Sequence, residues 1–424
     1  MELQMDYYKV TSSPPLHGEV LISGAKNAVL PVMAASLLAR GTSKITNVPN
    51  LKDVRTMADV LRVVGAQISF DAGKMEIDCS RVTHFEAPYE LVVTMRASIY
   101  VLGPLLARYG RARVSLPGGC AWGPRPVDLH IWGMEQLGAQ VEVTHGYIEA
   151  TAERLKGAYI HFPISSVGAT ANVLMAAVLA EGETTLDNAA VEPEIDNLCH
   201  FLISMGAKIQ GVGSRTLRIE GVSELSPGES TTIPDRIEAG TFLVAAAMTR
   251  GQVRVKKVIP KDLMEVIRTL VKMNLQVDYG EDWIELDARS AELKPVKVIT
   301  QPFPGFPTDM QPQFMALLST VPGNSVIQET VYPDRFKHLS ELDRLGATIQ
   351  LQGDTAIIEG GARLTAAKVM TSDLRAGAAL ALAGLAAKGT TEVSRIYHMD
   401  RGYERFEEKL SAIGGLIERC RDND

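Results

Sequence analysis

The chain repeats one phrase six times, and this repetition limits what it can fold into. The phrase has Gly-Ala at its centre in four copies and Asn-Leu or Gly-Gly in the other two, and it leads into a β-branched residue. The copies span residues 64–68, 137–141, 205–209, 273–277, 345–349 and 413–417, with steps of 68 to 73 residues. A fixed period of this kind predicts copies of one structural unit that pack together.

A second marker recurs with nearly the same period. An apolar, Ala/Leu-rich segment ends at a glycine, in steps of 66 to 72 residues. The glycines are Gly41, Gly110, Gly182, Gly251, Gly323 and Gly389. Glycine suits the left-handed position after a helix. Two markers in step therefore predict six units, divided most simply into two similar domains of three.

Each unit has the same expected order of elements. An apolar helix, its glycine and a β-rich strand precede an amphipathic helix and a strand pair, which predicts an α/β protein. The first helices are expected at 27–39, 97–107, 169–180, 241–249, 313–320 and 376–387. They are apolar nearly all round, and a helix without a polar face is buried on every side. We therefore expect buried central helices with sheets facing solvent.

Composition narrows the function classes. A chain of 424 residues exceeds one ordinary core, which again favours two domains. The net charge of −7 argues against a nucleic-acid binder. No secretion signal and no run long enough to span a membrane is found, so we expect a cytoplasmic protein without a membrane partner.

The chain has none of the usual cofactor signatures. Its four cysteines form no Cys-x-x-Cys or Cys/His pattern, which favours free thiols in a reducing compartment. No glycine-rich nucleotide loop and no His/Asp/Glu ligand pattern is present. We therefore expect neither a metal nor an organic cofactor.

Polar residues gather where the apolar helices begin. They are Lys26, Asn27, Arg96, Ser165, Ser166, Arg236, Glu238, Asp309, Gln311, Asp373 and Arg375. Helix N-termini carry unpaired N–H groups and attract anions. Each residue taken alone has a simpler explanation. Lys26 can be a surface lysine, and Asp309 can be a helix cap. The three arginines can be ion-pair partners of Glu238 and Asp373. Recurrence at one phase of the repeat favours a shared anion-binding face.

The loop at 116–129 contains the most reactive side chain in this pattern. Two glycines precede Cys120, and Gly-Pro-Arg-Pro follows it. A thiol reacts according to nearby charge and exposure, and Arg125 suits a carboxylate or phosphate. A structural cysteine beside a turn is the alternative. Near the C-terminus, Arg401 and Arg405 lie one helical turn apart and either share a functional face or mark a solvated helix start.

These residues together resemble the enolpyruvyl transferases that act on UDP-N-acetylglucosamine. The matching segments are 23–27, 94–98, 117–120, 125–129, 306–311 and 400–405, and the resemblance covers essentially the whole chain. It implies two inside-out α/β domains of three repeats each. Their implied bounds are residues 22–233, and residues 1–21 with 234–424, so that the first strand, roughly 5–21, packs with the C-terminal domain.

The resemblance also implies a reaction. The enolpyruvyl group of phosphoenolpyruvate is joined to the 3-hydroxyl of the UDP-sugar with release of phosphate, in peptidoglycan precursor synthesis. Cys120 is the implied proton donor and Asp309 the group that accepts or orients the hydroxyl proton. Lys26, Asn27, Arg125, Arg375 and Arg401 are implied to hold phosphoenolpyruvate. The implied UDP-sugar contacts are Arg96, Arg125, Pro126, Val127, Asp128, Leu129, Ser165, Ser166, Val167, Asp309 and Val331.

Two departures from the family pattern are Ile164, where some members have lysine, and the bulky Trp122 in the Cys120 loop. With Cys120 present, we expect the epoxide fosfomycin to inactivate the chain. The alternatives are transfer to another acceptor such as shikimate 3-phosphate, a non-catalytic UDP-sugar binder, and an RNA-end-processing enzyme, which the acidic balance disfavours.

Overall fold

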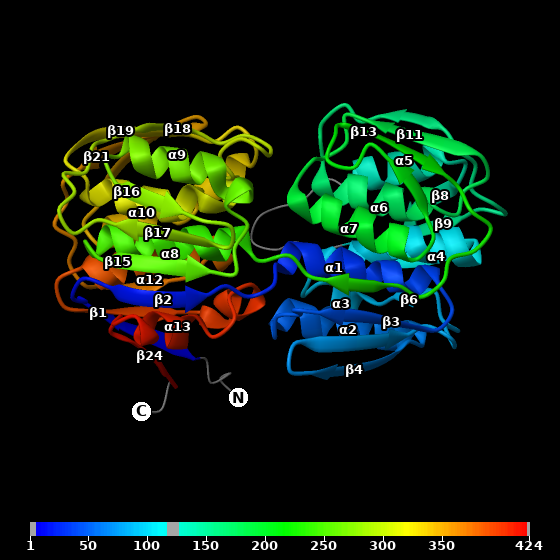
Figure 1. The fold of residues 1–424 in the computed structure, drawn as a ribbon, viewed down its shortest axis with the longest axis horizontal. Helices are drawn as coiled ribbons and strands as arrows, with labels where there is room; N and C mark the ends of the chain where they lie inside the picture. Colours follow the sequence, from blue (N-terminus) through cyan, green and yellow to red (C-terminus); the bar gives the residue numbers. More distant parts are fainter. Residues whose placement is uncertain (1–5, 117–126, 422–424) are drawn as a thin grey trace. The chain divides into compact units, whose positions relative to one another are not determined.

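The computed structural model describes residues 6–116 and 127–421. By contacts, the chain divides into two compact units, each drawn in Figure 1. Unit N is the continuous stretch Gly24–Ile233. Unit C combines Met1–Ser23 with Pro234–Asp424. Within the described residues, no helix is long and apolar enough to cross a membrane.

Each unit contains three small sheets of the same topology. In unit N the described strands form the four-stranded sheets β14-β3-β5-β4, β6-β7-β9-β8 and β10-β11-β13-β12, and in unit C β16-β17-β15-β2, β18-β19-β21-β20 and β22-β23-β1-β24. Each sheet has one parallel edge pair, such as β14 with β3, and two antiparallel pairs, such as β3–β5 and β5–β4. The predicted six-fold repeat thus corresponds to six sheets of one design.

The strands are short. In unit N they are β3 (Thr42–Thr46), β4 (Gln67–Asp71), β5 (Lys74–Asp78), β6 (Glu86–Ala87), β7 (Arg111–Ser115), β8 (Gln140–Thr144), β9 (Tyr147–Thr151), β10 (Tyr159–His161), β11 (Glu183–Asp187), β12 (Lys208–Gln210), β13 (Thr216–Glu220) and β14 (Glu229–Thr231). In unit C they are β1 (Tyr7–Thr11), β2 (His17–Leu21), β15 (Gln252–Lys256), β16 (Gln276–Tyr279), β17 (Trp283–Asp287), β18 (Lys297–Ile299), β19 (Gly323–Gln328), β20 (Thr348–Gln352), β21 (Thr355–Gly360), β22 (Lys368–Met370), β23 (Thr390–Ser394) and β24 (Ile417–Cys420). Many alternate buried and exposed residues, as half-buried strands do.

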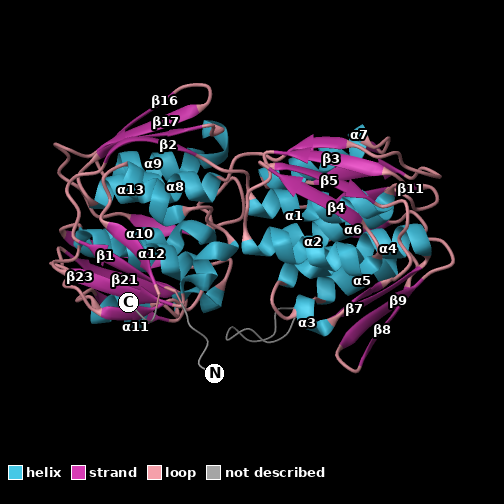
Figure 2. Cartoon of the chain, turned by 90° about the horizontal axis from the view of Figure 1, so that it is seen from below, coloured by secondary structure: helices cyan, strands magenta, loops and turns pink. Residues whose placement is uncertain are grey.

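The apolar helices lie inside each unit, as predicted, and Figure 2 shows them between the sheets. They are α1 (Lys26–Ala35), α4 (Leu102–Tyr109), α6 (Val167–Ala177), α8 (Arg236–Met248), α10 (Gln311–Thr320) and α12 (Leu374–Ala386). All residues of α8 after Arg236 are buried. Short 3₁₀ segments adjoin some of them: η1 (Ser36–Leu38), η2 (Arg96–Val101) and η4 (Thr308–Met310). The inside-out arrangement is therefore confirmed.

The second helix of most of the six repeats is amphipathic and packs beside the sheet of its repeat. These helices are α2 (Lys52–Val64), α5 (Asp128–Gln136), α7 (Pro193–Ser204), α9 (Met264–Lys272), α11 (Leu339–Arg344) and α13 (Phe406–Ala412), with the shorter α3 (Tyr89–Val92) and the 3₁₀ turns η3 (Pro260–Leu263), η5 (Pro333–Phe336) and η6 (Ile396–Arg401). α2 and α9 bury one stripe and expose the other. Separate apolar cores fill the two units.

One predicted glycine conformation is wrong. Five of the six helix-ending glycines have positive φ, but after α8 it is Arg250 that adopts the left-handed conformation, with φ of 57°. Gly251 is needed there for a different reason, because a Cβ on it would come within 2.1 Å of the Leu16 carbonyl oxygen. Here the glycine allows close approach of the N-terminal segment rather than a turn.

The N-terminal segment completes two sheets of unit C. β1 pairs with both β23 and β24, and β2 pairs in parallel with β15. In unit N the corresponding closing strand comes from the other end of the unit, because β14 pairs with β3. Unit C is therefore built from both ends of the chain, while unit N is closed by its own residues.

Candidate active site

The densest group of predicted site residues in unit C surrounds Asp309. This residue lies in η4, where Pro307 precedes the turn that leads into α10. One carboxylate oxygen accepts a hydrogen bond from Arg335 Nη2 at 2.8 Å. The other accepts from Arg375 Nε at 3.1 Å and Nη2 at 2.8 Å. Asp309 is thus held by two guanidinium groups, and Arg375 donates two N–H groups to the same carboxylate oxygen.

Arg375 is almost fully buried, at 3 % exposure. Burial lowers the pKa of its guanidinium, but the Asp309 carboxylate and other nearby acidic groups outweigh this effect and raise the pKa above the ordinary value. Its guanidinium carbon lies 5.4 Å from the centre of the Tyr403 ring. The Tyr403 hydroxyl is in turn 2.8 Å from Thr241 Oγ1 and accepts from Gln313 Nε2 at 3.2 Å. Tyr403, held by Thr241 of α8 and Gln313 of α10, therefore helps to fix the position of Arg375.

Asp373 and Glu238, considered from sequence as partners of the arginines, make contacts of other kinds. Asp373 caps α12, accepting from the Arg375 and Ala376 backbone N–H groups, while the Arg375 side chain turns to Asp309. Glu238 accepts a hydrogen bond from Lys409 Nζ at 2.6 Å. Burial raises the pKa of Glu238 to about 7 although Lys409 opposes the shift.

Arg401 and Val331 complete the predicted set in unit C. Arg401 ends η6, a segment anchored by the ion pair of Asp400 with Arg419. Val331 follows β19 and is 40 % exposed, so its side chain is accessible to a ligand. Its backbone N–H is held by Glu329 Oε1 at 3.0 Å. Both residues therefore lie on segments held by charged side chains.

In unit N, the predicted residues begin helices. Lys26 is the first residue of α1 and Asn27 the second. The Lys26 ammonium lies 3.6 Å from the carboxylate of Asp53, which is buried in the first turn of α2. This pair holds a lysine at a helix N-terminus, where backbone N–H groups and a cation together favour anions.

The residues predicted to contact the UDP-sugar occupy three more helix starts. Arg96 begins η2 and Asp128 begins α5, with Val127 before it and Leu129 after it. Ser166 is the N-cap of α6, where its hydroxyl accepts from the Ala169 N–H at 3.3 Å. Ser165 and Val167 flank it and are half-buried. Neighbouring Ile164 is 70 % exposed, so an apolar side chain borders this turn.

A buried amide joins these three starts. Asn172 in α6 is fully buried, accepts from the Gly103 N–H at 2.7 Å and donates to the Ile99 carbonyl at 2.9 Å. Its remaining N–H lies 3.0 Å from His130 Nδ1 in α5. Burial lowers the pKa of His130 to about 4, so at neutral pH the ring is uncharged and Nδ1 accepts. We call Asn172 and His130 the amide–imidazole pair.

The structure therefore brings some predicted residues together and leaves others unplaced. Asp309 and Arg375 are in direct contact, and Lys26, Arg96, Asp128 and Ser166 begin helices of unit N. Cys120, Arg125 and Pro126 lie outside the described residues. Their predicted roles stay predictions.

Sequence reasoning missed four residues that organise these places. Arg335 and Lys409 carry charges into the sites of Asp309 and Glu238, and Asn172 and His130 form the amide–imidazole pair. Asn172 has a signal in the sequence, since it is the one amide side chain in a largely apolar helix. A buried amide must find hydrogen-bond partners, so such a residue is a candidate for fixing neighbouring segments.

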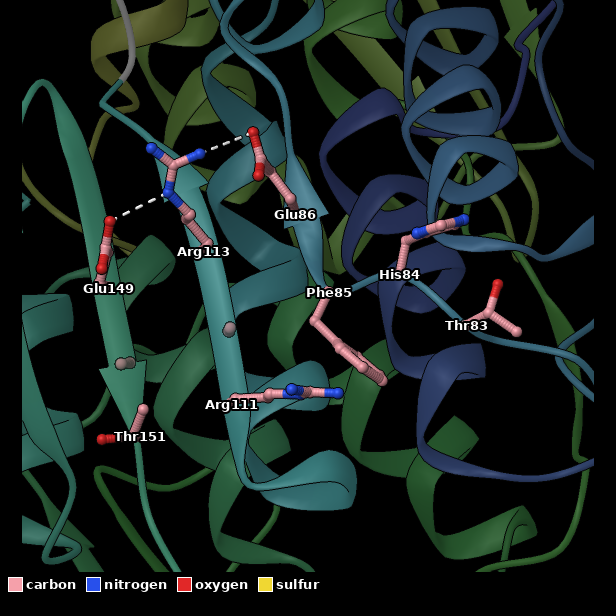
Figure 3. A pocket seen from close by; sticks show the side chains of 10 residues that line it. Thr83, His84, Phe85, Glu86, Arg111, Arg113, Glu149 and Thr151 are labelled. Atoms are coloured by element: carbon pink, nitrogen blue, oxygen red, sulfur yellow. Dashed lines mark hydrogen bonds and ion pairs between the residues drawn. The ribbon is translucent and has the colours of Figure 1, made fainter.

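A surface hollow lies elsewhere, on the sheet of β6, β7 and β9, and none of the predicted site residues lines it. It has a volume of about 390 Å³ (Figure 3). Arg113 inside it already bonds Glu86 at 2.8 Å and Glu149 at 3.0 Å, and Arg111 stacks on Phe85 at 4.4 Å. The charge of Arg113 is therefore matched by two carboxylates.

The comparisons with known proteins identify the family. The model of the family EPSP synthase (3-phosphoshikimate 1-carboxyvinyltransferase) matches residues 10–410. A protein of Carboxydothermus hydrogenoformans named UDP-N-acetylglucosamine 1-carboxyvinyltransferase 2 is 54% identical over 419 residues, covering 99% of this chain and 100% of its own. The chain belongs to this family of enolpyruvyl transferases. It is therefore a transferase, as the sequence indicated.

Further relatives agree with this membership in the enolpyruvyl transferase family. Proteins named UDP-N-acetylglucosamine 1-carboxyvinyltransferase from Shewanella putrefaciens and Coxiella burnetii are each 53% identical over 417 residues, covering 98% of this chain and 100% and 96% of their own. Among solved structures, the enolpyruvyl transferase NikO from Streptomyces tendae aligns with a TM-score of 0.90, at 26% identity, over 99% of this chain and 100% of NikO. An EPSP synthase from Acinetobacter baumannii, at 19% identity and a TM-score of 0.75, shares the fold over 98% of this chain and 100% of its own.

Proposed function

We propose that this enolpyruvyl transferase moves the enolpyruvyl group of phosphoenolpyruvate to the 3-hydroxyl of UDP-N-acetylglucosamine and releases phosphate. The observation that carries the proposal is the 54% identity, over the full length of both chains, to a relative named for that activity. In a cell the product is a peptidoglycan precursor, and we propose the cytoplasm as the place of synthesis.

The proposed reaction is an addition followed by an elimination. A proton is added to the methylene carbon of phosphoenolpyruvate while the sugar hydroxyl oxygen bonds to the neighbouring carbon, giving a tetrahedral adduct. Loss of that proton and of phosphate restores the double bond. The first step needs an acid near the methylene carbon and an acceptor for the hydroxyl proton.

Asp309 is the proposed acceptor or orienting group. Its contacts with Arg335 and Arg375 support a fixed, ionised carboxylate, which accepts a hydrogen bond from a hydroxyl without needing to move. The same two arginines occupy both carboxylate oxygens and so fix the direction in which the group accepts a further hydrogen bond. Orientation of the hydroxyl is therefore the larger part of the proposed role.

The phosphate and carboxylate of phosphoenolpyruvate are proposed to meet Lys26, Asn27, Arg125, Arg375 and Arg401. Lys26 at the start of α1 supports this assignment for unit N. The UDP-sugar is proposed to meet Arg96, the 125–129 segment, Ser165–Val167 and Val331. Helix N-termini at Asp128 and Val167 suit a diphosphate, since their N–H groups point outward from the helix.

Cys120 is the proposed proton donor. A free thiol has a reference pKa of about 8.5 and is mostly protonated at neutral pH, so it can act as an acid. The test measures phosphate release from phosphoenolpyruvate and UDP-N-acetylglucosamine in wild type, Cys120→Ala and Cys120→Asp. We expect release by wild type, at least a hundredfold loss in Cys120→Ala and retained release in Cys120→Asp.

Each other outcome points elsewhere. Unchanged release in Cys120→Ala would keep the transferase and assign the acid to another residue. No release by wild type, with the UDP-sugar still bound, would favour a non-catalytic binder. Release only with shikimate 3-phosphate as acceptor would replace the proposed substrate. Fosfomycin is expected to alkylate Cys120, and mass spectrometry showing an unmodified thiol in the active enzyme would refute that.

A further inference from the structure

A buried carboxylate joins the loops that carry Asp309 and Val331. Glu329 directly follows β19 and is 1 % exposed. Its Oε1 accepts from the backbone N–H groups of Val331 at 3.0 Å and Tyr332 at 2.8 Å. Its Oε2 accepts from the hydroxyl of Thr308, the residue before Asp309, at 2.9 Å. A single side chain thus fixes two loops more than twenty residues apart in the chain.

The carboxylate also reaches a third segment. Thr300, directly after β18, donates its hydroxyl to Glu329 Oε1 at 2.7 Å. Thr300 Oγ1 in turn accepts from the Thr330 N–H at 2.9 Å. Every hydrogen bond named here comes from a neutral donor. The site needs acceptor atoms in fixed places more than it needs a negative charge.

The segment that contains Val331 and Tyr332 continues to Arg335, the second partner of Asp309. The Arg335 N–H bonds the Tyr332 carbonyl at 3.0 Å, and the Arg335 guanidinium bonds Asp309. Fixing Tyr332 therefore fixes the origin of the Arg335 side chain as well. Both members of the Asp309–Arg335 pair depend on one carboxylate.

We propose that Glu329 is a positioning residue for the transfer reaction, holding Asp309 and the Val331 loop at the spacing that the sugar requires. This rests on the proposed function, because it assigns Asp309 to the sugar hydroxyl. Glu329 itself does not touch the reacting atoms. A displacement of about 1 Å in a reacting group can cost about a hundredfold in rate, which is the scale such positioning controls.

Two matched threonine variants test the proposal. Thr308→Val and Thr300→Val each remove one hydroxyl from Glu329, but only Thr308 adjoins Asp309. Thr300 is fully buried and makes the further bond to Thr330, so its loss disturbs the fold more. We expect Thr308→Val to lower kcat about tenfold, and Thr300→Val to lower it less than threefold while melting at the lower temperature.

Glu329 variants complete the set. Glu329→Gln keeps one oxygen for Thr300, Val331 and Tyr332 and turns its amide to the Thr308 hydroxyl, so we expect kcat within fivefold of wild type. Glu329→Ala leaves those donors unpaired and is expected to lose about a hundredfold in kcat, with a smaller rise in KM for phosphoenolpyruvate.

The readout is kcat and both KM values, with a melting curve for each variant. Activity that falls in the order of melting temperature, with Thr300→Val worse than Thr308→Val, would mean a structural role only and overturn the proposal. Wild type without transfer to the UDP-sugar would instead defeat the proposed function. The two failures are therefore distinguishable.

Discussion

The two units order their candidate site residues by different means. In unit C, charges are paired inside the protein: Asp309 with Arg335 and Arg375, and Glu238 with Lys409. In unit N, Lys26 is also paired with Asp53, but three other helix starts are tied together by the neutral amide–imidazole pair. Removal of one partner of a buried ion pair leaves an uncompensated charge in the interior, which strongly destabilises the protein. A neutral network that loses a member loses only hydrogen bonds. The units should therefore differ in their response to mutation and to pH.

The largest expected effect comes from breaking the pair in unit C. Arg375→Ala opens a cavity and leaves Asp309 with one guanidinium, so we expect unfolding free energy to fall by about 5 kcal/mol and turnover to be lost. Urea unfolding measures the first and phosphate release the second. Arg289→Ala is the control, because its pair with Asp287 is largely exposed and is expected to cost less than about 1 kcal/mol. Equal losses would remove the distinction between buried and surface pairs.

The corresponding change in unit N is Asn172→Ala. It leaves the Gly103 N–H, the Ile99 carbonyl and His130 Nδ1 without the partner they have now. We expect a loss of about 4 kcal/mol, since each buried group left unpaired costs about 1–3 kcal/mol. Affinity for the UDP-sugar should fall more than affinity for phosphoenolpyruvate, measured by calorimetry. Asn324→Ala, at an exposed strand end, should change neither.

One buried group in each unit is expected to make the free energy of unfolding depend on pH. The two dependences have opposite signs. The pKa of Glu238 is raised to about 7 from 4.5, so its protonated form favours folding, and that contribution is lost as pH rises from about 4.5 to 7. The pKa of His130 is lowered to about 4 from 6.5, so its contribution is present above 6.5 and lost as pH falls to about 4. Each shift corresponds to on the order of 3 kcal/mol.

Single variants isolate these two slopes. We expect Glu238→Gln to remove a decline in unfolding free energy with rising pH, and His130→Gln to remove a decline with falling pH. His338 in unit C has a pKa lowered to about 4, like His130, so only the difference between wild type and variant is informative. If the difference in unfolding free energy between wild type and variant changed with pH in the same direction for both variants, the assignment would be contradicted.

The smallest effect compares two equivalent glycines. Gly182 in unit N has φ of 93° with nothing within 4 Å of an added Cβ, so Gly182→Ala should cost about 1 kcal/mol through backbone strain. In unit C, an added Cβ on Gly251 would meet the Leu16 oxygen at 2.1 Å, so Gly251→Ala should cost about 2 kcal/mol. Thermal melting measures the loss of stability in both variants. A larger loss in Gly182→Ala than in Gly251→Ala would mean that the N-terminal segment moves easily to make room for the added Cβ.

Periodicity predicted the repeated units and the buried helices, whereas the packing of the first strand with the C-terminal unit was implied only by the family resemblance. Helices apolar all round had to be buried, and six copies of one unit gave six sheets of one design. The exception at Gly251 arose because its neighbour Leu16 is more than two hundred residues away in the chain. A local pattern contains no information about such a contact.

The site was predicted in outline but not in its pairings. Residues at helix starts could be found because the repeat marks where helices begin. That Arg375 would turn from Asp373 to Asp309 depended on burial and on the position of Arg335, neither of which spacing encodes. The support from Glu329 and Asn172 was missed for the same reason, since each joins segments distant in sequence.

The closing strands have a consequence for synthesis on the ribosome. Unit N is continuous from Gly24 to Ile233, so every residue it needs has been made before unit C is half translated. β1 must wait for β23 and β24, which are translated after every other strand of unit C that the structure describes. Because domains fold as they emerge, the earliest residues of the chain are among the last to find their places. A truncation of the final strand would therefore leave an unpaired edge on β1, at the opposite end of the chain.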